Sequence, residues 1–137
     1  GLALAIEQST LPQQAPPAQE RITELLAQYT SAMGSFGTGP GQMDTLVLGC
    51  THYVFVEKQL QALLGPDVRL VSTGEAVARQ TRRLLEGAGV LSAGPAERSS
   101  PQGMALFTTG DLHGLQAAAE RWLGLPPGSC HQAPAII

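Results

Sequence analysis

The residues of this chain best suited to chemistry lie together in one short segment, LVLGCTHY, at positions 46–53. An apolar run ends at a glycine, and Cys50, Thr51 and His52 follow it directly. A cysteine thiolate is both a base and a nucleophile, and an imidazole exchanges protons near neutral pH. The segment therefore predicts proton-transfer or nucleophilic chemistry at Cys50.

The elements expected around Cys50 favour its thiolate. The apolar run predicts a strand over 45–48, and the spacing of apolar residues after it predicts a helix over 54–64. Backbone N–H groups and the dipole at the start of such a helix stabilise an anion by about 0.3–1 kcal/mol. The competing interpretation is structural, because cysteine is among the most buried residue types and Thr51 is a good helix cap.

Other candidate sites are weaker. Cys50 and His52 alone fall short of the three or four ligands that zinc needs, and His113, Cys130 and His131 have no metal-ligand spacing, so no metal is expected. The glycine-rich residues 37–41 lack the Lys-Ser/Thr ending of a phosphate loop. Residues 108–111, with the sequence TTGD, predict a turn and a helix cap.

Composition narrows the class of protein. The 137 residues suit one domain or parts of two, and the 43% hydrophobic content allows a core. A formal charge of −3 argues against a nucleic-acid partner. The longest apolar runs fall well short of the roughly 20 residues of a membrane span, so no membrane partner is expected. Two cysteines far apart in the sequence favour free thiols and a cytoplasmic location.

Helical and strand patterns alternate along the chain. This order predicts an α/β fold with a mainly parallel sheet and flanking helices. The strand over 45–48 shows no polar alternation, so both of its faces should be covered. Residues 88–103 are expected to be mobile, and the tail from about 126 to be disordered. Helices are expected over 1–8, 18–33, 54–64, 74–86 (with Val77, Thr81, Leu84 and Leu85 inward) and 112–122, and strands over 45–48, 68–71 and 104–108.

Residues 46–53 strongly resemble the second cysteine motif of bacterial glutamate racemases. The likeness continues through 56–64, the TGEAVAR segment at 73–79 and FTTGD at 107–111, and it covers nearly all of 1–124. The resemblance implies the carboxyl-terminal half of a two-domain, pseudo-symmetric racemase fold. Residues 1–72 would then belong to the second α/β domain, and residues 73–137 would return to the first.

The resemblance also implies an activity and a role for individual residues. Such racemases use no cofactor; two cysteines on opposite faces of the α-carbon convert L-glutamate to D-glutamate for peptidoglycan synthesis. Cys50 would be one of these two cysteines, and His52 would poise it. Thr51 and His52 would bind the substrate, and Glu7 falls where the family often has an assisting acid.

The sequence departs from the family pattern in ways that leave alternatives open. The family's first half, with the other cysteine, is absent; Val54 replaces a proline and Ser72 an aspartate. One alternative is a non-catalytic remnant or partner module with the racemase fold. Another is an acyl-transfer or hydrolytic enzyme using Cys50 with His52, although side chains two apart at a helix start seldom meet. A homodimer with two facing copies of Cys50 would supply the second thiol.

Overall fold

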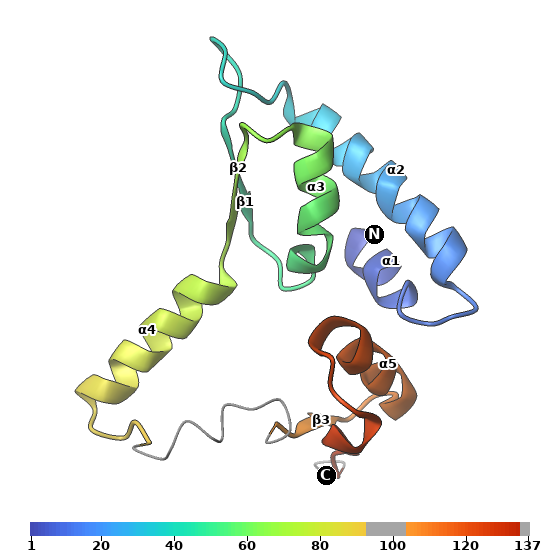
Figure 1. Ribbon diagram of the computed structural model, residues 1–137, viewed down its shortest axis with the longest axis vertical. Helices are drawn as coiled ribbons and strands as arrows, with labels where there is room; N and C mark the ends of the chain where they lie inside the picture. The colour runs from blue at the N-terminus through green and yellow to red at the C-terminus, as the bar shows by residue number, and fades with distance from the viewer. Residues whose placement is uncertain (93–103, 135–137) are drawn as a thin grey trace.

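The computed structural model describes residues 1–92 and 104–134 and shows an α/β chain built in two parts (Figure 1). Helices and short parallel strands alternate, as the sequence pattern predicts. The first part holds α1 (Leu2–Gln8), α2 (Ala15–Met33), β1 (Thr45–Leu48), the 3₁₀-helix η1 (Tyr53–Val56), α3 (Glu57–Leu64), β2 (Arg69–Ser72) and α4 (Gly74–Gly87). The second holds β3 (Leu106–Thr108), α5 (Leu112–Leu123), the 3₁₀-helix η4 (Pro127–Ser129) and β4 (Cys130–Gln132).

The core of the first part lies between the β1–β2 pair and the helices α1, α2 and α3. The two strands pair in parallel, from Thr45 opposite Arg69 to Leu48 opposite Ser72. All three helices lie on the same side of this pair (Figure 1). Buried apolar side chains from each of these helices form one core cluster with Leu48, at the end of β1. This packing places the residues that follow β1 next to the end of α1.

The opposite side of the strand pair is open, which differs from the prediction of a strand covered on both faces. Val47 points to that side and is 60% exposed. Successive side chains of a strand point to opposite faces, so the covered face takes Leu46 and Leu48 while Val47 is left to solvent.

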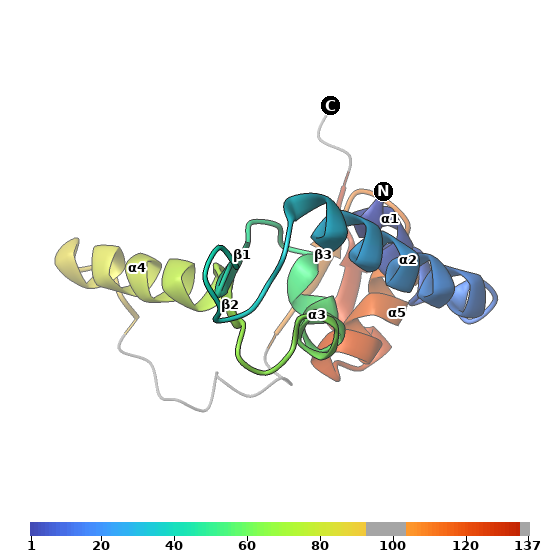
Figure 2. The same cartoon turned by 90° about the horizontal axis from the view of Figure 1, so that it is seen from above.

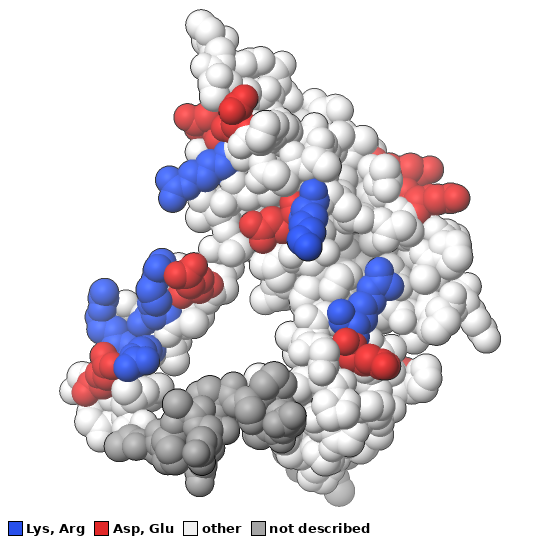
Figure 3. Space-filling view, in the orientation of Figure 1, with Lys and Arg blue, Asp and Glu red and all other residues white. Residues whose placement is uncertain are grey.

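Helix α4 projects away from both cores. It leaves the carboxyl end of β2 and runs clear of α1–α3 and α5 in both views (Figures 1 and 2). The predicted helix is confirmed, but the predicted inward position of its apolar residues is wrong, since all four are exposed. Arg79 and Arg82 form exposed i,i+4 pairs with glutamates, and Figure 3 shows mixed charges along the helix.

The second part is a smaller unit in which α5 packs on two parallel strands. Strand β3 pairs with β4, with Leu106 opposite Cys130. Asp111 caps α5 through the N–H groups of His113 and Gly114, as predicted, and Gly124 ends the helix with a left-handed φ of 64°. A φ of this sign suits glycine, which has no Cβ to clash.

The expectation of a disordered tail from about residue 126 is wrong for the part of the tail that the structure describes. Residues 127–132 form η4 and β4, and Ala133 N–H donates to the carbonyl of Thr108. The tail lacks periodicity because its order comes from pairing with β3 and not from a local pattern. Residues 93–103, most of the segment expected to be mobile, lie outside the described residues.

Two boundaries differ from the predictions for local reasons. The helix expected over 54–64 begins as the 3₁₀-helix η1, and Val56, with φ −117° and ψ 13°, separates it from α3. Helix α2 starts at Ala15, earlier than predicted, because prolines fit the first turn of a helix, where their missing N–H has no partner to lose.

Candidate functional site

Cys50 lies in a tight turn between the carboxyl end of β1 and the first residue of η1. The N–H of Tyr53 donates to the carbonyl of Cys50 at 3.2 Å, which closes the turn. The turn brings Cys50 Sγ to 3.8 Å from His52 Nδ1. The expectation that these two side chains would not meet is therefore wrong, because a turn, and not a regular helix, separates them.

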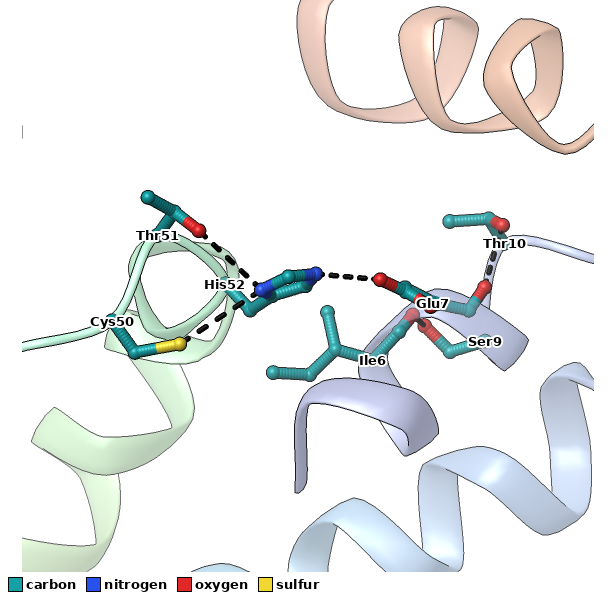
Figure 4. Close-up of polar contacts among 7 residues, drawn as sticks. All are labelled: Ile6, Glu7, Ser9, Thr10, Cys50, Thr51 and His52. Carbon is teal, nitrogen blue, oxygen red and sulfur yellow. Dashed lines mark hydrogen bonds and ion pairs between the residues drawn. The ribbon is translucent and has the colours of Figure 1, made fainter. Parts of the chain in front are cut away.

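The other ring nitrogen of His52 faces α1. His52 Nε2 lies 2.7 Å from Glu7 Oε1, near the end of that helix. The structure thus brings three of the predicted site residues into one row, with the imidazole between the thiol and the carboxylate (Figure 4). An ionised carboxylate only accepts, so the proton resides on Nε2, and in neutral His52 the Nδ1 atom is free to accept the thiol proton.

The electrostatics of this row favour a charged pair. The pKa of the Cys50 thiol is lowered, first by the backbone N–H of His52 and then by the His52 side chain. The pKa of His52 is raised, first by the hydrogen bond with Cys50 and then by the one with Glu7. Partial burial opposes both shifts but does not outweigh them. A thiolate beside an imidazolium is a base that is ready to take a proton.

Thr51 lies beside the row with its side chain exposed. Its Oγ1 is 3.5 Å from His52 Nδ1 (Figure 4). It is not the cap of η1, because His52 occupies that position. The capping interpretation is therefore wrong, and the exposed Thr51 hydroxyl lies beside the His52 ring.

A cavity of about 680 Å³ lies beside the Glu7–His52 pair. Residues from α1, η1, β3 and α5 line it, most of them apolar, and they include Phe55, Asp111 and Trp122. Sequence reasoning missed Phe55 and Trp122. The chain has a single tryptophan, which was a signal, but nothing in the local sequence indicates its partner.

The other polar candidates do not belong to the row of Cys50, His52 and Glu7. Cys130 is a free, buried thiol in the core under α5. The TTGD residues serve as the predicted turn and cap, with Gly110 N–H donating to Thr108 Oγ1. Across residues 1–92 and 104–134, no three His, Cys, Asp or Glu side chains are grouped to hold a metal ion. Over the same residues, no helix has both the length and the apolar character needed to cross a membrane.

Comparison with known proteins finds glutamate racemases. No family model matches the chain. The curated glutamate racemase of Ectopseudomonas mendocina is 38% identical over 124 residues, which are 90% of this chain and 41% of that protein. The one from Symbiobacterium thermophilum is 42% identical over 91 residues, 66% of this chain and 31% of that protein. The one from Methylococcus capsulatus is 50% identical over 86 residues, 54% of this chain and 30% of that protein.

A solved structure agrees with these relatives. The glutamate racemase isoform RacE1 from Bacillus anthracis matches 85% of this chain and 40% of its own, with a TM-score of 0.61 and 26% identity. The resemblance read from the cysteine motif is thereby confirmed. The chain spans between about a quarter and two fifths of the length of the relatives it matches.

Proposed function

Because this chain is a partial-length member of the glutamate racemase family, we propose that it forms part of an enzyme that interconverts L- and D-glutamate. The observation that carries the proposal is the row of Cys50, His52 and Glu7, which supplies a thiolate base with its own proton relay. Glutamate is the proposed substrate, and no cofactor takes part in the proposed route.

In this mechanism the Cys50 thiolate removes the α-proton from one face of glutamate. The S–H bond forms as the C–H bond breaks, and the electron pair left on the α-carbon spreads into the carboxylate. A second thiol on the opposite face then gives a proton to the planar carbon, which inverts the centre. In the reverse direction Cys50 donates its proton. Excluding water and stabilising the developing charge are the main demands on such a site.

The neighbours of Cys50 have distinct proposed roles. His52 keeps Cys50 ionised, and Glu7 holds the imidazole in the required tautomer and orientation. Thr51, through its exposed hydroxyl, and His52 bind the substrate. Cys130 is not the opposing thiol, because it is buried in the separate core under α5. That thiol comes from the remainder of a full-length racemase or from a second copy of this chain.

The wider role follows from the same family. We propose that residues 1–72 complete one racemase domain and that residues 73–137 return to the other. The open side of β1 and the exposed apolar face of α4 support this division, because both lack a covering layer among the described residues. The enzyme would act in the cytoplasm and supply D-glutamate for peptidoglycan, and so for cell-wall growth and cell shape.

The test is to incubate the chain with L- and with D-glutamate in heavy water. Loss of the α-proton signal by NMR reports abstraction, and optical rotation reports inversion. We expect deuterium to enter the α-position of at least one enantiomer and this exchange to vanish in Cys50→Ala. Exchange no faster than in Cys50→Ala would contradict the proposal for this chain and favour a non-catalytic module with the racemase fold.

One observation favours a second candidate function. The contact between the Cys50 thiol and the His52 imidazole, with Glu7 behind it, also suits nucleophilic acyl transfer. An activated ester such as p-nitrophenyl acetate discriminates the two functions. A thioester on Cys50, detected by mass spectrometry and turned over by water, would support acyl transfer. A racemase needs no such intermediate.

A further inference from the structure

The two residues of the Glu7–His52 pair belong to separate elements. Glu7 is on α1 and His52 is on the turn before η1, and their side chains are 61% and 31% exposed. An ion pair this exposed to solvent contributes little free energy, so it does not by itself hold the two side chains in place. The distance between the two side chains therefore depends on how α1 and η1 are held relative to each other.

Helix α5 contacts both of these elements through adjacent residues. Arg121 donates from Nη1 to the carbonyl of Ser9, directly after the end of α1. Trp122 stacks on Phe55 of η1, with ring centroids 4.7 Å apart and 21° between the planes. The Arg121 guanidinium also lies 4.8 Å from the Trp122 ring, so the two contacts support each other.

Both contact points lie close in sequence to the pair. Ser9 is two residues after Glu7, and Phe55 is three residues after His52. Ser9 is 1% exposed, and its hydroxyl donates to the carbonyl of Ile6, so this end of α1 is well anchored. A restraint on Ser9 and on Phe55 is therefore a restraint on the two backbones that carry Glu7 and His52.

The cavity explains why such a restraint is needed. It lies between α1, η1 and α5, and Glu7, His52, Phe55 and Trp122 all line it. Helices α1 and η1 pack on each other in the main core, and the cavity leaves the other side of this contact without packed side chains. On that side, Arg121 and Trp122 connect α5 to both elements.

We propose that Arg121 and Trp122 are positioning residues that hold Glu7 against His52 and so set the reactivity of Cys50. The catalytic meaning of this inference rests on the proposed racemase function. What the inference predicts directly is the reactivity of the Cys50 thiol, which can be measured without any turnover of glutamate.

The experiment measures how fast iodoacetamide alkylates Cys50 across a pH series in the complete 137-residue chain. Mass spectrometry of the Cys50 peptide separates it from Cys130, and circular dichroism reports the fold of each variant. The titratable groups facing His52 are Cys50 and Glu7. On the α5 side, Asp111 lines the same cavity with its carboxylate engaged in capping the helix.

We expect Trp122→Ala and Arg121→Met to slow Cys50 alkylation near neutral pH by about threefold or more, which corresponds to about half a pKa unit. Trp122→Phe keeps an aromatic ring on Phe55 and should restore most of the rate. Arg82→Met removes an arginine from an exposed pair on α4 and should leave the rate unchanged. A folded Trp122→Ala or Arg121→Met with the parent rate would overturn the proposal.

A double-mutant cycle separates positioning from general loosening. In a Glu7→Gln background the relay is already weakened, so Trp122→Ala should slow alkylation little further. An equal loss in both backgrounds would show that Trp122 acts independently of Glu7 and would overturn the inference. If Trp122→Ala does not fold, Arg121→Met in the same cycle decides. Deuterium exchange into glutamate tests the racemase proposal, whereas the alkylation rates test the positioning proposal. The failure of one can therefore be distinguished from the failure of the other.

Discussion

His52 Nε2 lies 2.7 Å from Glu7 Oε1, although 45 residues separate the two side chains in the sequence. The contact gives the imidazole a defined tautomer and leaves its other nitrogen facing the Cys50 thiol. The proton transfer between Cys50 and His52 that the local motif suggests therefore depends on a long-range contact. The effect of this contact on Cys50 and His52 can be measured.

The first prediction concerns the pH dependence of Cys50 reactivity. Its lowered pKa means that alkylation of Cys50 should reach half its maximal rate at a lower pH in the folded chain than in the urea-unfolded chain. His52→Gln removes the imidazole and should move that midpoint upward. The rates are best measured in a Cys130→Ala background, which leaves one thiol to titrate. An unchanged midpoint in His52→Gln would show that the imidazole does not stabilise the thiolate.

The second prediction concerns the titration of His52. Its pKa should lie above the value of about 6.5 for a free imidazole and should fall in Glu7→Gln. A raised pKa in the folded state stabilises the fold below the unfolded pKa, and this contribution disappears as pH rises through the folded pKa. The stability difference between parent and Glu7→Gln should therefore shrink from about pH 6 upward.

NMR titration of the His52 ring gives the pKa directly, and urea unfolding at several pH values gives the stability difference. His113→Gln, which removes an exposed histidine on α5, is the matched control. A stability difference between parent and Glu7→Gln that stays constant over this range would contradict the linkage.

The third prediction compares a buried apolar residue with an exposed one in the helices. Ile22 of α2 is 1% exposed in the main core, so Ile22→Ala should cost about 2–5 kcal/mol of unfolding free energy. Leu84 of α4 is 63% exposed, so Leu84→Ala should change it by no more than about 0.5 kcal/mol. Urea denaturation measures both. A large, concentration-dependent cost of Leu84→Ala would instead show that a second copy covers α4.

The fourth prediction concerns the start of α5. Asp111 accepts from the N–H groups of His113 and Gly114, so Asp111→Ala should destabilise the fold by about 1 kcal/mol. Thermal unfolding detects a loss of this size. Asp67→Ala, in the turn before β2, removes an exposed aspartate away from any helix start and should have a smaller effect. Equal effects of the two substitutions would exclude a capping role.

Patterns within a few residues were well predicted from the sequence. The apolar spacing of Ile22, Leu25 and Leu26 indicated helix α2, and these side chains are buried as an amphipathic helix requires. Asp111 was predicted to cap α5, because capping depends on residues two or three positions away. Strand β1 was located to the residue by its apolar run.

Features that depend on a distant partner were not predicted. The exposure of Val47 depends on which elements cover it, and the lack of polar alternation reports only that the strand is apolar. Strand β4 forms because β3 offers free backbone donors and acceptors to residues 130–132, which carry no strand pattern of their own.

The sequence by itself determined which residues are the candidates for chemistry, since Cys50, Thr51 and His52 are adjacent and follow a strand. The tertiary structure alone decided that Glu7 reaches His52. The same holds for Arg121, whose contact at Ser9 spans 112 residues. The physical reason is that packing between elements far apart in the sequence sets these distances, and no spacing along the chain encodes them.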